Sequence, residues 1–123
     1  MKIVGSGIDL VAVPRFEKTV QRSGKRLLNR LFTAQELSYA RARRAMVQHL
    51  AARFAAKEAV VKALGAPKGL GLRWKDLEIT RASSGQPRVL LRGSLRRWRK
   101  LEVHLSLTHT PEYAVASAVV VAP

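Results

Sequence analysis

The chain has 123 residues, of which 47% are hydrophobic and none is cysteine. This length and composition are typical of one globular domain, so the sequence predicts a single domain over residues 1–123. The lack of cysteine excludes a disulfide framework, a thiolate nucleophile and a cysteine metal site. Any metal must therefore be held by oxygen or histidine.

The chain is strongly basic, with 23 Lys and Arg residues against eight Asp and Glu residues and a formal net charge of +15. Such a charge attracts polyanions and speeds the encounter with an acidic partner. Nucleic acid, an acidic protein and a phosphorylated small molecule all stay open, as does an arginine-rich composition without any partner. The first residues show no basic leader with a long apolar stretch, and no run reaches the roughly 18 apolar residues of a membrane span. We expect a cytoplasmic protein with no membrane partner.

The first expected elements are a buried strand over residues 3–11 and a helix that Pro14 begins, since its fixed φ suits a first helical turn. Gly5 and Gly7 interrupt the strand, which indicates a bulge or a close approach of another backbone segment. Gly24 weakens the helix and predicts a kink or an early end. One face of this helix is basic, and its cations are Arg15, Lys18, Arg22, Lys25 and Arg26.

Two further helices are expected before the middle of the chain. Thr33 followed by Glu36 has the form of a capping box and predicts a helix start. The alanine-rich residues 46–64 predict the longest helix, with an apolar stripe that faces the core, and Gly65 ends it. Lys57 falls within this stripe, so its ammonium must either extend to solvent or contact an anion.

Short strands dominate the rest of the chain. A basic, glycine-containing loop at residues 66–71 precedes them, and the turn at 83–87 predicts a hairpin. Residues 95–101 predict one short helical segment. The expected strands are residues 77–80, 88–91, 103–108 and 114–121.

Asp9 is a carboxylate inside an apolar run. Burying a carboxylate costs several kcal/mol unless a metal, hydrogen bonds or a counter-charge satisfies it. Glu58 and Lys62, which lie beside the apolar stripe of the long helix, are the candidate partners. Small alanine neighbours leave space around them, and space next to a carboxylate and an ammonium suits a ligand.

Each of these residues also has a simpler explanation. Asp9 is equally well placed to cap the helix that follows, and Glu58 with Lys62 has the spacing of an ordinary surface pair on a helix. His109, at the end of a strand, has the position of a hydrogen-bonded structural histidine. The basic helix face is also compatible with simple solvation.

Three motifs nevertheless follow one another along the chain. They are Gly7-Ile8-Asp9-Leu10-Val11, Phe54-Ala55-Ala56-Lys57-Glu58-Ala59 with Lys62, and Ser106-Leu107-Thr108-His109. Together they resemble the holo-(acyl-carrier-protein) synthase family, the small single-domain 4′-phosphopantetheinyl transferases. The resemblance implies an α+β fold with an antiparallel sheet and a long central helix, which assembles as a homotrimer with coenzyme A between subunits. It also implies Mg²⁺-dependent transfer of the 4′-phosphopantetheine arm of coenzyme A to a serine of apo acyl carrier protein.

The resemblance further implies roles for individual residues. Asp9 and Glu58 would bind Mg²⁺. Glu58 and Lys62 would be catalytic: Lys62 stabilises charge on the departing phosphate, and either Glu58 or a metal-bound water takes the serine proton. The residues assigned to coenzyme binding are Lys57, Lys62, Lys68, Gly69 and His109. The residues assigned to docking of the acidic carrier are Arg15, Lys18, Arg22 and Arg26.

The main alternative is a small basic nucleic-acid-binding module, which the charge alone supports. The few aromatic residues are not interleaved with the basic helix face as stacking platforms would be. Such a module also has no need of Asp9. A catalytically silent subunit of a larger synthase is a third alternative, but it leaves the combination of Asp9, Glu58 and Lys62 without a purpose. We therefore expect a transferase and no nucleic-acid partner.

Overall fold

The computed structural model describes residues 1–67 and 69–123. The elements in chain order are β1 (Lys2–Ala12), α1 (Val13–Leu31), α2 (Ala34–Arg41), α3 (Met46–Leu64), η1 (Trp74–Asp76), β2 (Leu77–Arg81), β3 (Pro87–Leu91), η2 (Gly93–Trp98), β4 (Glu102–His109) and β5 (Tyr113–Ala122). The strands β1, β5 and β4 form an antiparallel sheet in that spatial order, and β2 and β3 form a separate hairpin. The expected α+β class is confirmed.

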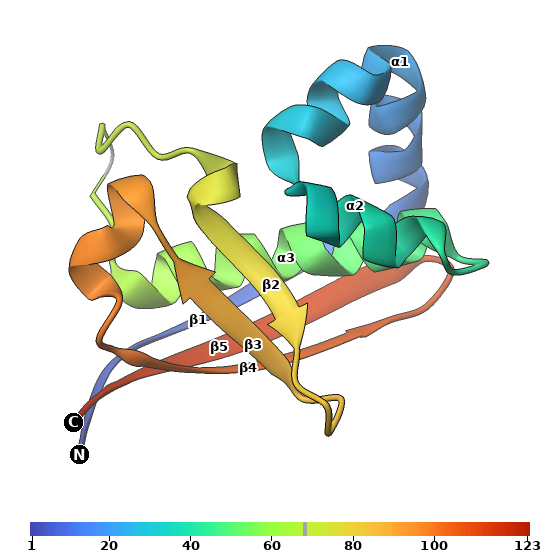
Figure 1. The fold of residues 1–123 in the computed structure, drawn as a ribbon. Helices are drawn as coiled ribbons and strands as arrows, with labels where there is room; N and C mark the ends of the chain where they lie inside the picture. The colour runs from blue at the N-terminus through green and yellow to red at the C-terminus, as the bar shows by residue number, and fades with distance from the viewer. Residues whose placement is uncertain (68) are drawn as a thin grey trace.

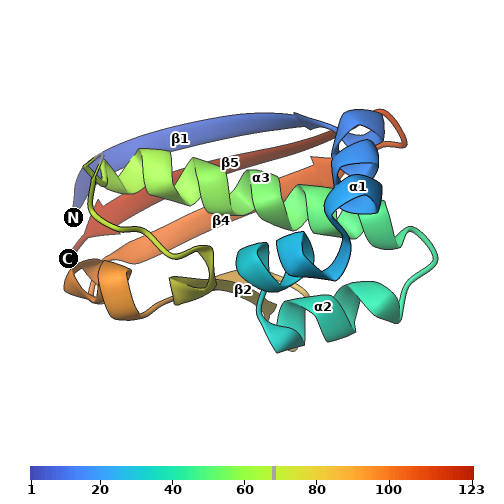
Figure 2. The same ribbon diagram turned by 90° about the horizontal axis from the view of Figure 1, so that it is seen from above.

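The long helix α3 lies at the centre of the molecule. The three-stranded sheet packs along one side of it, and α1, α2 and β2 pack on the others (Figures 1 and 2). Ala55, Ala56 and Ala59 on this helix are fully buried. Because alanine side chains are short, the neighbouring elements approach α3 closely without leaving voids. The predicted central helix is confirmed, with the bounds expected from the sequence.

Strand β1 lies directly against the backbone of α3. A Cβ atom at Gly5 would collide with the carbonyl oxygen of Ala63, and one at Gly7 would collide with the carbonyl oxygen of Ala59. The pairing of β1 with β5 also shifts register between Ile3 and Gly5, which is the position of a bulge. Both expectations from these glycines are therefore confirmed, and they fix the distance between the strand and the helix.

The prediction that β1 is a buried strand was wrong. Ile3, Ile8 and Leu10 are 64%, 65% and 61% exposed, because β1 is an edge strand and the outer face of its sheet is uncovered. Only the face that carries the glycines and Asp9 turns toward α3. The apolar run suggested burial on both sides, since its outward residues are as apolar as a core strand would be.

The elements that depend on local signals match the sequence closely. Thr33 caps α2 with a complete capping box that includes Glu36, and Gly65 ends α3 in the left-handed conformation with φ 66°. Gly24 (φ 56°, ψ −143°) is not helical and divides α1 into two helical stretches across a kink. The helical segment expected at 95–101 is instead the 3₁₀ turn η2, which begins earlier, at Gly93. In the ranges 1–67 and 69–123, no helix has the length and apolarity to cross a bilayer.

Candidate active site

Asp9 and Lys62 form an ion pair that joins β1 to the last turn of α3. The Lys62 ammonium lies 3.1 Å from Asp9 Oδ1 and donates a second hydrogen bond to the carbonyl oxygen of Ile8 at 3.0 Å. Asp9 does not cap α1, because the N-cap position is Ala12 and no side chain satisfies it. The carboxylate in the apolar run is therefore explained by a partner 53 residues away in sequence.

Glu58 lies one helical turn before Lys62 and faces the same cleft as Asp9. Burial raises the pKa of Glu58, and the nearby Asp9 carboxylate raises it further, while Lys62 acts in the opposite direction. Among the described residues Lys62 pairs with Asp9 and not with Glu58. The simple surface pair at this spacing is therefore absent, and Glu58 remains an acid that is costly to ionise.

The cleft has a volume of about 710 Å³ and is open to solvent on one side. Asp9 and Glu58 lie in its wall together with Arg15 and Arg30. The larger apolar residues of its lining are Leu10, Phe16, Leu27, Leu31, Phe54 and Trp74. A cleft with two carboxylates, two arginines and an apolar wall suits a ligand that carries both phosphates and an apolar arm.

The donor set of this cleft fits Mg²⁺. In the described part of the chain, no group of three or more His, Cys, Asp or Glu residues gathers to hold a metal. Asp9 and Glu58 nevertheless supply two carboxylates near enough for one to raise the pKa of the other. Mg²⁺ commonly binds through one or two carboxylates, with substrate phosphates and waters as the remaining ligands. The residues present therefore suit a magnesium ion that arrives together with a phosphorylated substrate.

The assignment of Lys57 to coenzyme binding was wrong. Its side chain is fully buried, and its ammonium lies 2.8 Å from Glu36 Oε1. It also donates hydrogen bonds to the carbonyl oxygens of Leu31 at 2.8 Å and Trp74 at 3.0 Å. The anion that the apolar stripe required is thus Glu36, a protein carboxylate, and no ligand can reach Lys57. Burial lowers the pKa of Lys57, and Glu36 opposes this effect.

His109 lies at the end of β4 and faces the N-terminal part of α3. Its Nδ1 is 2.9 Å from Oε1 of Gln48, and its ring lies 4.8 Å from the ring of His49 between centroids. Burial lowers the pKa of His49, and the charges of His109 and Arg43 lower it further. The surroundings of His109 are therefore already rich in positive charge.

Arg53 is a site candidate that the sequence did not reveal. It is 3% exposed, and its Nε has no hydrogen-bond partner among the described residues. Its guanidinium carbon lies 4.1 Å from the centre of the Tyr39 ring, and those of Arg43 and Arg81 lie 3.4 and 5.6 Å from the same centre. Three guanidinium groups around one ring, one of them buried and incompletely bonded, suit an anion.

One signal in the sequence pointed to Arg53. It is a charged residue in an alanine-rich helix, one turn before Lys57, where burial was already expected. Helix geometry also shows on which sides of α3 the two groups lie. Glu58 and His49 are nine residues apart on α3, which at about 3.6 residues per turn is two and a half turns. The cleft with Glu58 and the cationic cluster near His49 therefore lie on opposite sides of the helix.

The other predicted residues fall into two groups. Gly69 lies in the exposed loop after α3 with φ 84°, and Lys68 lies outside the described residues. The proposed docking residues on α1 are all exposed, and none forms an ion pair among the described residues; they are Arg15, Lys18, Arg22 and Arg26. Their charges are thus available to a partner.

The chain has an α+β fold, two carboxylates in one cleft, a lysine that pairs with one of them, and a second cluster of cations behind the same helix. These are the features of an enzyme that binds a phosphorylated substrate. The family model of the 4′-phosphopantetheinyl transferase superfamily matches residues 5–118. The chain therefore belongs to this superfamily.

Individual relatives agree with this result. The holo-(acyl-carrier-protein) synthase of Desulforudis audaxviator is 49% identical over 125 residues, which covers 98% of this chain and 95% of the relative. Among solved structures, the acyl carrier protein synthase of Mycobacterium tuberculosis is 37% identical, with a TM-score of 0.78 over 99% of this chain and 100% of that one. The enzyme from Bacillus anthracis in complex with CoA (3′,5′-ADP) is 32% identical, with a TM-score of 0.79 over 96% of each chain.

Proposed function

We propose that this protein transfers the 4′-phosphopantetheine arm of coenzyme A to a serine of an apo acyl carrier protein, and that residues 1–123 act as one domain. The observation that carries the proposal is that Asp9 and Glu58 line one cleft and that Lys62 pairs with Asp9, in a chain of this superfamily. The relatives named as holo-(acyl-carrier-protein) synthases and the CoA-bound relative support the substrates. Since these substrates belong to the cytoplasm, we propose that location too.

In the reaction, the serine hydroxyl of the carrier attacks the β-phosphorus of coenzyme A. A bond forms between the serine oxygen and this phosphorus, and the bond from the phosphorus to the bridging oxygen breaks. Adenosine 3′,5′-bisphosphate leaves with the bridging oxygen on its α-phosphate. Such transfers depend on alignment and on neutralising charge around the phosphate oxygens.

Asp9 and Glu58 are the residues that would hold Mg²⁺, which when bound neutralises charge on the pyrophosphate. Lys62 is proposed to hold the α-phosphate and to stabilise its charge as the bond breaks, since it lies beside Asp9 and its side chain is 52% exposed. We assign the serine proton to Glu58. Its place in the wall of the cleft beside Asp9 supports this role, since the reacting phosphate is proposed to bind there.

The other end of the coenzyme is proposed to bind at the cationic cluster of Arg53, Arg43 and His109. The guanidinium groups of Arg43, Arg53 and Arg81 gather around the Tyr39 ring, and their positive charge suits the 3′-phosphate. The same role stays proposed for the loop with Lys68 and Gly69. Because the cleft and the cluster are on opposite sides of α3, we propose that one coenzyme contacts the cleft of one subunit and the cluster of another.

This arrangement agrees with the homotrimer that the family resemblance implies. The outer face of the β1-β5-β4 sheet supports self-association, since Ile8 and Leu10 are exposed on it and none of the described elements covers them. We propose that subunits meet through this face and place coenzyme A between them. A trimer of this kind predicts that the isolated subunit binds coenzyme A weakly.

The carrier is proposed to dock on the basic face of α1. Arg15 lines the cleft, and Lys18, Arg22 and Arg26 continue along the same helix, unpaired among the described residues. Acyl carrier proteins are acidic, so this face attracts the carrier and places its serine near Glu58.

One assay tests the function. The protein is incubated with coenzyme A, Mg²⁺ and apo acyl carrier protein, and the carrier should gain the mass of one phosphopantetheine. Asp9→Asn, which keeps the size of the side chain, should abolish the gain, and a chelator should do the same. The rival nucleic-acid module predicts no gain with any carrier, together with tight and salt-sensitive binding of nucleic acid.

A further inference from the structure

The ammonium of Lys62 lies against Asp9, one of the two residues that would hold a metal. It lies 3.1 Å from Oδ1, and its second hydrogen bond, to the carbonyl oxygen of Ile8, holds it there at 3.0 Å. The Asp9 side chain is only 17% exposed, so few other directions of approach are free. A divalent cation and this ammonium cannot both lie against the same oxygen, because like charges at such a distance repel strongly.

Glu58, the other proposed ligand, lies one helical turn before Lys62 and lines the same cleft as Asp9, but it forms no ion pair with Lys62 among the described residues. In the free protein, this lysine therefore supplies the positive charge that pairs with Asp9. A metal ion would bring this charge instead, and Lys62 would then be left without a partner unless an anion is present.

We propose that Lys62 is an internal counter-cation that keeps divalent metal off Asp9 until coenzyme A arrives. The inference rests on the proposed function, in which Asp9 binds the metal and Lys62 binds the phosphates. Asp9 would hold the metal once Lys62 has moved to the α-phosphate, so coenzyme A would release the residue that the metal needs, and the metal would release Lys62 for the coenzyme. Because coupling between two ligands is reciprocal, coenzyme A strengthens metal binding by the same factor as metal strengthens coenzyme binding.

The geometry makes such an exchange feasible. The Lys62 side chain is 52% exposed, and an ion pair of this kind is weak in water. The contrast with Lys57, which is completely buried against Glu36, is informative. Of these two lysines, five residues apart on one helix, only Lys62 is free to change partners.

The test measures metal binding to the free protein, without coenzyme A. Mn²⁺ serves as the probe, since it takes the same oxygen ligands as Mg²⁺ and its binding can be followed by electron paramagnetic resonance. Lys62→Met should bind Mn²⁺ roughly three- to tenfold more tightly than the wild type, as expected for the loss of one partly exposed competing charge. Lys62→Arg, which keeps the charge, should stay as weak as the wild type.

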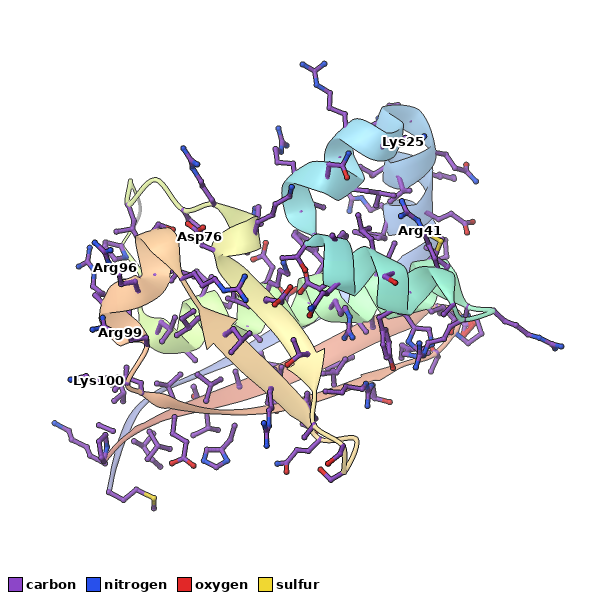
Figure 3. All side chains as sticks on the ribbon, viewed as in Figure 1. Lys25, Arg41, Asp76, Arg96, Arg99 and Lys100 are labelled. Carbon is purple, nitrogen blue, oxygen red and sulfur yellow. The ribbon has the colours of Figure 1, made fainter. Side chains whose placement is uncertain are left out.

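Lys100→Met is the matched control for net charge. Lys100 is exposed just after η2, and Figure 3 shows it on the opposite side of the molecule from α1, which supplies several residues of the cleft, so its loss should leave Mn²⁺ binding unchanged. Asp9→Asn in the Lys62→Met background should remove the gained affinity, which places the effect at Asp9. Equal or weaker Mn²⁺ binding by Lys62→Met, with circular dichroism unchanged, overturns the inference, as does an equal gain in the Lys100→Met control.

A second measurement uses the unaltered protein. Addition of Mg²⁺ together with coenzyme A should shift the nuclear magnetic resonance signal of the Lys62 Cε far more than Mg²⁺ alone, and an equal shift with Mg²⁺ alone contradicts the exchange.

Failure of the inference is distinct from failure of the proposed function. If the wild-type protein modifies the carrier but Lys62→Met gains no affinity for Mn²⁺, the proposed function holds and the inference fails. If Lys62→Met gains affinity but the wild-type protein modifies no carrier, the exchange at Asp9 holds and the proposed function fails.

Discussion

Lys57 and Glu36 form an ion pair with no exposed side-chain surface, in which the Lys57 ammonium lies 2.8 Å from Glu36 Oε1. The two carboxylate oxygens of Glu36 also accept hydrogen bonds from the backbone N–H groups of Thr33 and Ile79. Lys57 in turn bonds the carbonyl oxygens of two cleft-lining residues, Leu31 and Trp74. One buried pair thus connects α3 to α2, β2 and both of these walls of the cleft.

Breaking this pair should strongly destabilise the protein. Lys57→Met leaves the Glu36 carboxylate buried without its counter-charge, and we expect the free energy of unfolding to fall by about 3–5 kcal/mol. Urea denaturation, followed by circular dichroism, measures the loss. Adding Glu36→Gln to the same chain should recover part of it, since no unpaired charge then stays buried. The single variant Glu36→Gln is measured as well. If the free energy lost by the double variant equals the sum of the losses of the two single variants, the ion pair is not the source of the stability.

The titration of Glu58 should be visible in the stability of the metal-free protein. Because its pKa is raised above the ordinary value of 4.5, the folded chain holds the proton more tightly than the unfolded chain does. The stabilising contribution is therefore present below pH 4.5 and is lost as the pH rises through the raised pKa. Glu58→Gln cannot titrate, so its stability relative to the wild type should increase with pH over this window.

Denaturant unfolding in the presence of a chelator, from about pH 4 to pH 7, checks this expectation. The control is Glu17→Gln, which alters an exposed carboxylate on α1. A difference between Glu58→Gln and the wild type that does not change with pH would mean that the folded and unfolded pKa values are equal.

Reversing charge on α1 should weaken the binding of the carrier and leave the binding of coenzyme A unchanged. The double change Arg15→Glu and Arg22→Glu is expected to raise the KM for acyl carrier protein several-fold, and more so at low salt, because it removes electrostatic attraction. The KM for coenzyme A should change little. Steady-state kinetics with each substrate varied in turn gives both values.

The control reverses two charges elsewhere. Arg96 and Arg99 lie on and just after η2, away from α1 (Figure 3). Their reversal changes the net charge by the same amount and should leave the KM for carrier near the wild-type value. An equal rise in this control would assign the effect to total charge, and an equal effect on both substrates would contradict docking on α1.

Arg53 should determine how well the protein recognises the 3′-phosphate. Arg53→Met removes the buried guanidinium, and we expect the KM for coenzyme A to rise about tenfold, the value of one charge-assisted hydrogen bond. The KM for 3′-dephospho-coenzyme A, which lacks this phosphate, should change much less. Arg41→Met, on the exposed side of α2 (Figure 3), is the control. Equal rises for both substrates would place the 3′-phosphate elsewhere.

Local structure could be predicted well from the sequence. The capping box at Thr33, the end of α3 at Gly65 and the β2-β3 hairpin each depend on residues within a few positions of one another. Such interactions do not depend on tertiary packing, so the local sequence is enough to predict them. Gly5 and Gly7 also predicted a contact between distant parts of the chain. A missing side chain in a strand indicates a close neighbour, although it does not identify that neighbour.

The partners of the charged residues could not be predicted in the same way. Helical periodicity placed Lys57 in an apolar stripe and required an anion for it, but it did not identify Glu36. It also gave no sign that Arg53 would be buried beside Tyr39 with a free Nε. The side that a helix turns to each neighbour depends on every element packed around it, which for α3 means three strands, the hairpin and two helices.

Asp9 and Lys62 show which part of the site could be predicted from the sequence and which part could not. The sequence by itself determined that a carboxylate in an apolar strand must have a partner, since an unpaired one is too costly to bury, and its motifs named the family to which the chain belongs. Only the tertiary structure decided that the partner in the free protein is the ammonium of Lys62. Contacts between residues 53 positions apart depend on how β1 rests against α3, and that packing is a property of the whole fold.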